Sequence, residues 1–431
     1  MARDRVEVLG VSTASPEAVW AIARDFCGAW HPAIATIRAE RDAAGHLVRA
    51  FTVHGEGTLY RERRTFFSDS EKTLAYTHLQ GIAGVDAYDG RVTVTAGEGG
   101  GSTILWTAQA EASDPVRLAA ICEGTKYIFE MGIAALSEAA IRSGEAPAGQ
   151  ALPAPVALNS MTVGETPRLA LTLSPPMDGP LCLFLHGIGG ARWNWEAQVS
   201  VVGSTMRAAA LDLRGYGDSQ LGPEQSTVED YCDDILSVMT ALGAEKLVLV
   251  GLSYGSWIAT SFAMRHPGRL AGLVLSGGCT GMSEAGVEER EAFRTSRQVP
   301  LDAGQTPADF APAVVKVLAG PEASEAVKDQ LFRSMAAIPS VTYRDALTCF
   351  TNPPERFDFS RLTMPVLMMT GEFDRLASPK EIRGVAGLIH AEASAADVRY
   401  ETIANAGHVC NVEQPSVYNR ILLEFLEGLP R

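Results

Sequence analysis

The chain has 431 residues, of which 46% are hydrophobic, and its mean hydropathy is +0.05. This length exceeds what a single hydrophobic core usually holds, so two domains are expected. A net charge of −15 argues against nucleic acid or an anionic membrane as a partner, because both would repel the protein.

The cysteines and the first residues of the chain allow a prediction of the cellular compartment. The seven cysteines are scattered and include no C-x-x-C pair, which favours reduced thiols over a disulfide framework or a zinc site. The start, Met-Ala-Arg-Asp-Arg-Val-Glu, lacks the apolar core of a signal peptide, and no apolar run approaches the length of a membrane span. A cytoplasmic protein is therefore expected.

Residues 1–143 predict a domain of mixed strands and helices. Ser15-Pro16-Glu17 predicts a helix start with a capping hydroxyl, a proline at the first helical position and an acid in the first turn. A short helical piece is expected around residues 30–34, and the charged residues of 60–64 are expected on a solvated strand face. The predicted strands cover residues 6–11, 47–53, 58–67, 73–79, 85–95 and 102–112, and a long amphipathic helix covers about 115–141.

This order of elements, with Ser-Pro-Glu-Ala-Val-Trp at 15–20 and Trp30-His31-Pro32, resembles the SRPBCC superfamily (START, Bet v 1-like, polyketide cyclase/dehydrase). The resemblance implies an α+β helix-grip fold, in which a curved sheet wraps around the final helix and encloses a cavity for a hydrophobic ligand. The residues expected at this cavity are Trp30, His31, Tyr60, Tyr76 and Trp106. No pair of polar residues here forms an acid–base constellation, so catalysis and simple ligand binding both stay open.

Residues 144–157, rich in Ala, Pro and Gly, predict a linker. Residues 158–431 then alternate short apolar strands with helical stretches, which is typical of a parallel sheet covered by helices on both faces. After a hairpin at 160–173, the predicted strands cover residues 181–185, 208–211, 247–250, 273–275, 366–369 and 398–402.

The most informative stretch is Gly251-Leu252-Ser253-Tyr254-Gly255, a G-x-S-x-G turn between an apolar strand and a helix-forming segment. A strand that passes directly into a helix must fold sharply, and this strains the central residue. Glycine on both sides removes the Cβ atoms that would clash. Ser253 is therefore predicted to point outward at the C-terminal edge of the sheet, as a nucleophile.

An activated serine needs a general base, and the base needs an acid that orients it. Asp374 and His408 both follow predicted strands and fall on loops at the same edge of the sheet as Ser253. Glu372 is the rival acid, but Asp374 lies further out along its loop. Cys410 lies near His408, but nothing around it favours a thiolate. The sequence therefore predicts a Ser253–Asp374–His408 triad.

Two further loops follow the first strands of this domain. In His186-Gly187-Ile188-Gly189-Gly190, the backbone N–H of Ile188 is expected to form an oxyanion hole together with the N–H of Tyr254. His186 is expected to brace this loop rather than to react. In the second loop, three charged residues are expected to lock the chain: Asp212, Arg214 and Asp218.

Six motifs in this order resemble the α/β-hydrolase fold superfamily over residues 157–431: HGIGG, DLRGYGDS, GLSYGS, RHPGR, PVLMMTGEFD and NAGHVCNVEQP. The resemblance implies an enzyme that uses no metal or cofactor. Ser rather than Asp at position 253 is similar to esterases, lactonases and C–C hydrolases, and argues against the dehalogenase branch.

Residues from about 279 to 355 predict a helical cap inserted over the active-site edge, so the substrate must fit a covered, mostly apolar pocket. The passage from residues 343–349 to Phe357-Asp358-Phe359 is similar to that of 3-oxoadipate enol-lactonases. The side chains considered for substrate contact are Trp193, Phe293, Arg294, Arg297, Met335, Tyr343 and Phe350.

These patterns favour hydrolysis of an ester, lactone or thioester of a small hydrophobic or aromatic substrate. Two alternatives stay open. In one, a bifunctional enzyme of an aromatic or polyketide-like pathway cyclises or dehydrates an intermediate in its first domain and hydrolyses it in its second, including by C–C cleavage. In the other, the protein is a small-molecule sensor or carrier, although a receptor would not need all three triad residues. Self-association, as a homo-oligomer, is also left open.

Overall fold

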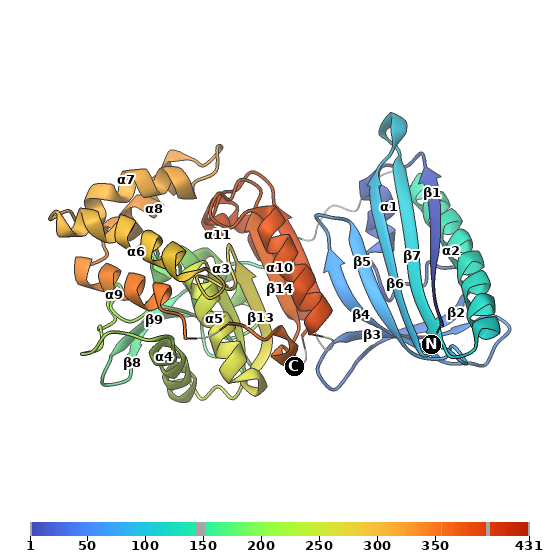
Figure 1. Ribbon diagram of the computed structural model, residues 1–431, viewed down its shortest axis with the longest axis horizontal. Coiled ribbons are helices and arrows are strands. Elements are labelled where there is room, and N and C mark those ends of the chain that lie inside the picture. The colour runs from blue at the N-terminus through green and yellow to red at the C-terminus, as the bar shows by residue number, and fades with distance from the viewer. Residues whose placement is uncertain (1, 144–150, 355, 394–396, 430–431) are drawn as a thin grey trace. The chain divides into compact units, whose positions relative to one another are not determined.

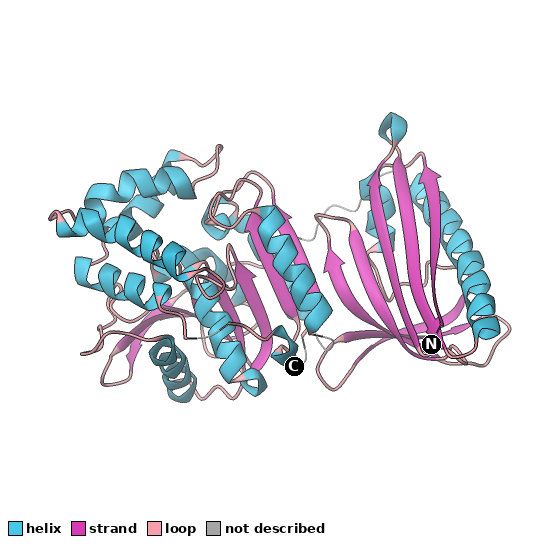
Figure 2. Cartoon of the chain, in the orientation of Figure 1, coloured by secondary structure: helices cyan, strands magenta, loops and turns pink. Residues whose placement is uncertain are grey.

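The computed structural model describes residues 2–143, 151–354, 356–393 and 397–429 (Figure 1). The chain divides into two compact units, namely residues 1–150 with 395–401 and residues 151–394 with 402–431. Strands dominate the first unit and helices flank the strands of the second (Figure 2). Residues 144–150 of the predicted linker lie outside the described residues, and the predicted domain boundaries stay a prediction.

The first unit is an antiparallel sheet curved around a long helix (Figure 1). Its strands follow the order β1-β7-β6-β5-β4-β3-β2. Helix α2 contacts β1, β7 and α1, so the sheet and the two helices enclose one core. The elements are β1 (Ala2–Ser12), α1 (Pro16–Ala23), β2 (Ile34–Arg41), β3 (Leu47–Val53), β4 (Tyr60–Ser68), β5 (Thr73–Gln80), β6 (Ala87–Ala96), β7 (Ser102–Ala112) and α2 (Pro115–Ser143).

Local signals for α1 and β7 are confirmed. The Ser15 hydroxyl accepts a hydrogen bond from the N–H of Ala18 at 3.2 Å, with Pro16 in the first helical turn. In β7, Ile104, Trp106 and other alternate residues are buried, as the apolar alternation predicted.

Two predictions for this unit are wrong. Residues 30–33 form a turn, in which the His31 ring accepts a hydrogen bond from the N–H of Ala33 at 3.1 Å and the His31 carbonyl accepts one from the N–H of Ile34 at 3.0 Å. Strand β2 starts at Ile34 instead. The sequence of β2 shows no alternation of apolar and polar residues, because no residue of this strand is fully buried. The segment is a strand because it pairs with β3.

The second correction concerns Glu62, which was expected on a solvated face but is only 6% exposed. Glu62 lies opposite Arg49 of β3 and accepts a hydrogen bond from the Arg49 Nε at 2.7 Å. The Arg49 guanidinium also lies 4.6 Å from the ring of Phe26 and 4.9 Å from that of Tyr76. A charged pair is therefore sealed among aromatic rings, where each ion depends on the other.

We predict that Arg49→Met destabilises the first unit by about 3–5 kcal/mol, because it leaves the buried Glu62 carboxylate without its counter-ion. The double variant Arg49→Met/Glu62→Gln should recover much of this loss. Hydrogen exchange of peptides from β3 and β4 in the intact chain measures both. Equal protection in the single variant and the wild type would contradict the prediction.

The second unit has a mainly parallel sheet in the order β8-β9-β11-β10-β12-β13-β14. The strands β11, β10, β12, β13 and β14 run parallel, and β8 and β9 form the predicted hairpin at one edge. The strands are β8 (Asn159–Val163), β9 (Leu169–Leu173), β10 (Leu181–Leu185), β11 (Ala208–Leu211), β12 (Leu247–Leu252), β13 (Leu270–Ser276) and β14 (Val366–Gly371). Strand β15 (Val398–Ile403) is divided between the units, since residues 398–401 belong to the first and residues 402–403 to the second.

Helices cover this sheet on both faces. Val248 and Val250 of β12 share a core with residues of α3 and α12, whereas α5 contacts β12 and β13 and packs on α4. Every residue of β12 is buried, as expected for a parallel strand covered on both sides. The helices of the unit are α3 (Glu196–Val202), α4 (Val228–Ala241), α5 (Tyr254–Arg265), α6 (Val287–Asp302), α7 (Pro307–Leu318), α8 (Glu325–Ala336), α9 (Ser340–Thr351), α10 (Pro379–Glu392), α11 (Cys410–Glu413) and α12 (Pro415–Glu427).

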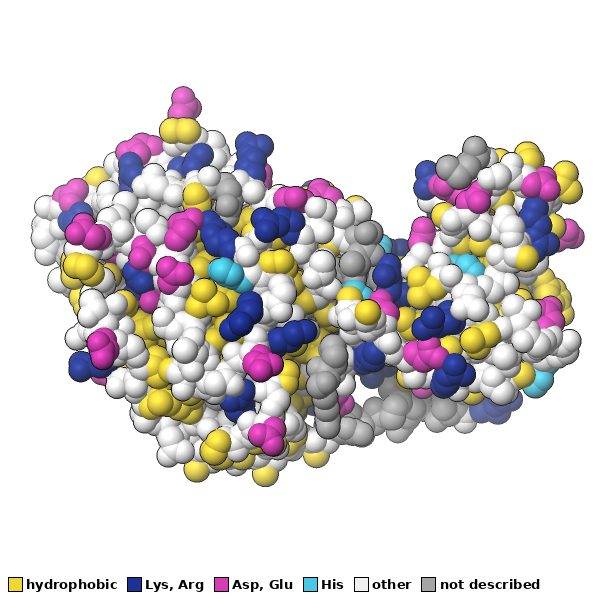
Figure 3. Space-filling view, turned by 90° about the horizontal axis from the view of Figure 1, so that it is seen from below, with side chains coloured by type: hydrophobic (Ala, Val, Ile, Leu, Met, Phe, Trp, Pro, Cys, Tyr) yellow, Lys and Arg dark blue, Asp and Glu magenta, His cyan; other side chains and the backbone are white. Residues whose placement is uncertain are grey.

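The helices α6 to α9 lie between β13 and β14 in the chain and group together in space (Figure 1). On the face shown in Figure 3, Lys and Arg side chains are interspersed with Asp and Glu, so the negative charge is not gathered into one patch there. Among the described residues, every helix is too short or too polar to cross a bilayer.

Candidate active site

The turn that carries Ser253 has the strained geometry that the G-x-S-x-G pattern predicted. Ser253 has φ of 55° and ψ of −114°, a region that costs a residue with a side chain of the order of 1–3 kcal/mol. A Cβ added at Gly251 would lie 2.3 Å from the Gly255 carbonyl oxygen, and one added at Gly255 would lie 2.4 Å from the Leu185 carbonyl oxygen. Both glycines are therefore required for the strand and helix to approach closely enough.

His408 and Asp374 form a buried hydrogen-bonded pair. The Asp374 Oδ2 lies 2.8 Å from the His408 Nδ1, and its Oδ1 accepts hydrogen bonds from the N–H groups of Leu376 at 2.8 Å and Ala377 at 2.9 Å. Burial alone would raise the pKa of Asp374, but the hydrogen bond and charge of His408 and these two N–H donors hold it below its usual value. Asp374 is therefore ionised at neutral pH and can hold a proton on the His408 Nδ1.

Neither rival residue takes part in this pair. The Glu372 carboxylate accepts a hydrogen bond from the Asn405 N–H at 3.0 Å. Cys410 is fully buried, and burial raises the pKa of its thiol, which disfavours the thiolate that a nucleophile requires.

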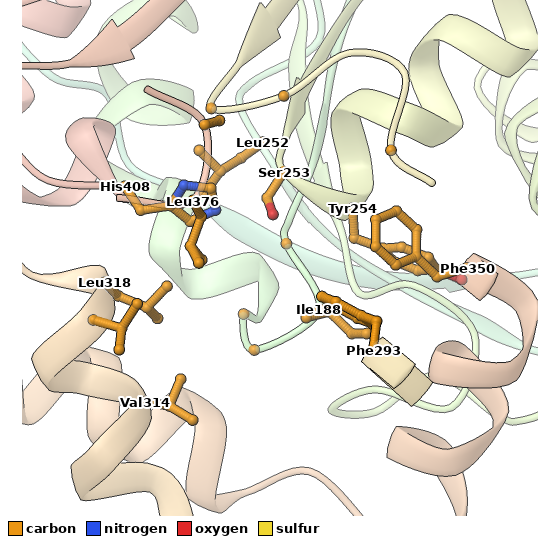
Figure 4. Close-up of a pocket in the computed structure, with 18 of the residues that line it drawn as sticks. Ile188, Leu252, Ser253, Tyr254, Phe293, Val314, Leu318, Phe350, Leu376 and His408 are labelled. Atoms are coloured by element: carbon orange, nitrogen blue, oxygen red, sulfur yellow. The ribbon is translucent and has the colours of Figure 1, made fainter. Parts of the chain in front are cut away.

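The other ring nitrogen of His408 faces the same cavity as Ser253. Its Nε2 is buried and has no hydrogen-bond partner among the described residues, and both residues line the pocket in Figure 4. Two glycines after β13 make room for them: a Cβ added at Gly277 would lie 3.1 Å from the His408 Cε1, and one added at Gly278 would lie 3.4 Å from the Ser253 Cα.

The loop after β10 lies against the serine. A Cβ added at Gly187 would lie 3.3 Å from the Ser253 Cβ. The N–H groups of Ile188 and Tyr254 donate no hydrogen bond to any other described residue, and the Tyr216 hydroxyl holds the Ile188 carbonyl at 3.1 Å. Two unpaired N–H donors thus flank the serine, from the loop on one side and from the start of α5 on the other.

The bracing roles expected of nearby polar residues are confirmed. The His186 Nδ1 donates to the Gly187 carbonyl at 2.8 Å, and its Nε2 accepts from the N–H of Leu213 at 3.1 Å. The charged residues of the next loop are paired as well. Asp212 and Asp218 both form ion pairs with Arg192, and Arg214 forms one with Asp234.

The cavity at Ser253 has a volume of about 830 Å³. Several residues considered for substrate contact line it, namely Phe293, Arg297, Met335, Tyr343 and Phe350. Trp193 and Arg294 do not. Trp193 lies in a short 3-10 helix (Arg192–Trp195) and is 38% exposed, and Arg294 pairs with Glu291 on α6. On a helix, residues 293 and 297 share one face because they are four positions apart, whereas residue 294 is rotated by about 100° from residue 293.

Sequence reasoning missed the aliphatic wall of this cavity. It comes from α7 and from the segment around the start of α10, and includes Val314, Leu318, Leu376, Ile382 and Val385. Apolar residues at helical spacing look the same whether they face a core or a pocket, so no sequence signal distinguished them.

Four of the residues predicted at a cavity of the first unit pack against one another. The Trp106 ring centroid lies 6.0 Å from that of Trp30 and 6.1 Å from that of His31, and the Trp106 N–H donates to the Tyr76 hydroxyl at 3.1 Å. These residues form one aromatic cluster beneath α2, where the His31 Nε2 lies 3.0 Å from the Ile128 carbonyl.

Tyr60 lies apart from this cluster. It stacks on Phe51 with ring centroids 5.4 Å apart and donates to Glu56 at 2.9 Å. A ligand site in the first unit stays a prediction.

Comparison with known proteins identifies the family of the second unit. A family model described as alpha/beta hydrolase fold matches residues 180–415, more than half of the chain. The chain belongs to the α/β-hydrolase fold family. A second model, described as polyketide cyclase/dehydrase and lipid transport, matches residues 4–140. Both resemblances seen in the sequence, and the predicted two-domain fold class, are therefore confirmed.

The proteins similar to this α/β-hydrolase are named for different hydrolytic activities. It is 36% identical over 109 residues to epoxide hydrolase B of Mycobacterium tuberculosis, covering 24% of this chain and 31% of that protein. It is 22% identical over 263 residues to 3-oxoadipate enol-lactonase 1 of Acinetobacter baylyi, covering 61% and 94%. A thermophilic esterase from Thermogutta terrifontis has a TM-score of 0.55 at 26% identity, covering 63% of this chain and 98% of that one. The chain thus spans about a third of the epoxide hydrolase's length and nearly all of the other two.

We predict that Gly255→Ala deforms the turn at Ser253, because the new Cβ would meet backbone carbonyl oxygens of Leu185 and His186 that cannot move freely. Covalent labelling of Ser253 by a fluorophosphonate should fall at least tenfold. Gly268→Ala is the matched control, since its Cβ would meet nothing within 4 Å. Unchanged labelling of Gly255→Ala would contradict the prediction.

Proposed function

We propose that the second unit is a serine hydrolase that cleaves a carboxylic ester, lactone or thioester of a small hydrophobic substrate. One observation carries the proposal: His408, bound through Nδ1 to the buried Asp374 at 2.8 Å, keeps its Nε2 without a partner in the cavity that Ser253 lines. A base oriented by a carboxylate, with a free nitrogen next to a strained serine, suits proton abstraction from that serine.

In the proposed mechanism, the His408 Nε2 takes the proton of the Ser253 hydroxyl as the Ser253 Oγ bonds to the carbonyl carbon. The N–H groups of Ile188 and Tyr254 then hold the oxyanion of the tetrahedral intermediate. Protonated His408 gives its proton to the leaving oxygen or sulfur as that bond breaks. Water attacks the remaining acyl-enzyme by the same route and releases the acid.

The chemistry of Ser253 favours a carbonyl substrate over an epoxide. Attack of a serine on an epoxide would leave an ether, and an ether has no carbonyl for water to attack in the second step. Attack on an ester, lactone or thioester leaves an acyl ester, which water can cleave. The similarity to an epoxide hydrolase, which covers 24% of this chain, therefore supports the fold rather than that activity.

A bifunctional enzyme is the second candidate, and the match of residues 4–140 to the polyketide cyclase/dehydrase model favours it. In it, the first unit would bind or convert a hydrophobic intermediate that the second unit hydrolyses. Native mass spectrometry of the full-length Ser253→Ala protein, after incubation with cell extract, tests it. A retained small molecule would support the candidate. If no small molecule is retained but esters are hydrolysed, the simple hydrolase is the remaining candidate. If esters are not hydrolysed either, the remaining candidate is a sensor that binds another ligand.

We predict that Ser253→Ala abolishes both fluorophosphonate labelling and hydrolysis of 4-nitrophenyl esters, because it removes the hydroxyl that attacks the carbonyl. Intact-protein mass spectrometry measures the labelling, and nitrophenolate absorbance measures the turnover. Retention of either in the variant would refute the assignment of Ser253.

Asp374→Asn should lower kcat by about 10²–10⁴-fold, because an amide no longer holds the proton on the His408 Nδ1. Glu372→Gln is the matched control on the same loop, since its carboxylate meets Asn405 instead of His408, and kcat should stay within threefold. If the Glu372 variant lost activity and the Asp374 variant kept it, Glu372 would be the orienting acid.

A further inference from the structure

The cavity has two chemically different sides. In Figure 4, His408 and three aliphatic side chains lie on one side of Ser253: Leu318, Val314 and Leu376. Tyr254, Ile188, Phe293 and Phe350 lie on the other. Because His408 donates a proton to the leaving group in the proposed mechanism, the leaving group belongs on the aliphatic side and the acyl group on the aromatic side.

Aromatic rings connect Ser253 to Arg297 along the acyl side. Tyr254, the neighbour of Ser253, meets Phe350 with ring centroids 5.5 Å apart, and Phe350 meets Phe293 at 5.9 Å. The Arg297 guanidinium carbon lies 3.4 Å from the Phe293 ring centroid. The rings therefore form a continuous series of aromatic contacts that ends at the Arg297 guanidinium, and Arg297 lines the cavity as well.

Arg297 forms no ion pair with any described acidic side chain. Its Nη1 donates to the Phe293 carbonyl at 3.1 Å and to the Ser296 hydroxyl at 3.2 Å, whereas its Nε and Nη2 donate to no described residue. Burial lowers the pKa of Arg297, and the nearby Tyr343 only partly opposes this. A partly desolvated cation without a counter-ion is unfavourable unless a ligand supplies the charge.

The acidic residues that line the cavity do not meet this need. Glu284, Glu289 and Glu381 are all exposed, and Glu284 lies 3.7 Å from Arg356. Glu289 lies two helical turns from Arg297 along α6, about 12 Å at 1.5 Å per residue. These three carboxylates are thus exposed to solvent, whereas the Arg297 guanidinium packs on the Phe293 ring.

We propose that Arg297 binds a carboxylate on the acyl portion of the substrate, so that the enzyme hydrolyses monoesters or lactones whose acyl group carries a second, ionised carboxyl group. The inference rests on the proposed serine hydrolase function and narrows its substrate class. Arg suits this role because the free Nε–H and Nη2–H point in parallel and can bind both oxygens of one carboxylate.

The test compares hydrolysis of matched 4-nitrophenyl esters by the full-length protein. The anionic set is the mono-4-nitrophenyl esters of succinate, glutarate and adipate, and each has a neutral partner of equal carbon number: butyrate, pentanoate and hexanoate. Arg297→Gln should lower kcat/KM for the best anionic ester about 10- to 100-fold, mainly through KM, as expected for loss of a charge-assisted hydrogen bond. Hydrolysis of its neutral partner should change less than threefold.

Two further variants separate recognition from structure. Arg297→Lys should retain part of the preference for the anionic ester, since it keeps the charge but not the paired donors. Arg294→Gln removes a cation from the same helix outside the cavity and should leave both ester sets unchanged.

Equal losses on anionic and neutral esters, or no Arg297-dependent preference at any chain length, would overturn the carboxylate site. Both results would leave the proposed hydrolase function intact. Failure of that function would look different, since no ester in either set would then show hydrolysis that depends on Ser253.

Discussion

The close approach of backbone around Ser253 is the constraint on which the rest of the site depends. Glycine at 251 and 255 lets β12 turn directly into α5, with the Gly255 backbone packed on the carbonyl of Leu185. Gly187 and Gly278 allow two further loops to touch the serine. Backbone therefore surrounds Ser253, and the sharp turns leave the N–H groups of Ile188 and Tyr254 without an acceptor among the described residues. Strain at one residue and open hydrogen-bond donors have the same cause.

The cap adds asymmetry to this site. The loops at the strand ends carry Ser253, Asp374 and His408, the triad of the proposed function. Helices α6 and α9 line one side of the cavity with aromatic rings, and α7 and the start of α10 line the other with aliphatic side chains. A substrate bound between them is oriented by its two halves as well as by its carbonyl. Residues of α6 to α9 can change without disturbing the turn at Ser253, so the same turn is compatible with cavities of different lining.

The core of the first unit contains polar groups that are buried in pairs. Its core holds an Arg49–Glu62 ion pair enclosed by Phe26 and Tyr76, and its aromatic cluster uses the Trp106 N–H and the Tyr76 hydroxyl to satisfy each other. Burying such groups is costly unless every partner is present. The interior of this unit therefore depends on paired polar groups as well as on its apolar core.

The sequence by itself determined the order of elements, the turn at Ser253 and the loops of Asp374 and His408, because apolar runs, glycines and chain order are local signals. It could not determine β2, whose residues are not fully buried, or the burial of Glu62, because both follow from pairing with a neighbouring strand. The residues of α6 were equally ambiguous, because Phe293, Arg294 and Arg297 all looked able to contact substrate. Only the tertiary structure decided which of them face the cavity, because helix rotation is set by packing against the rest of the fold.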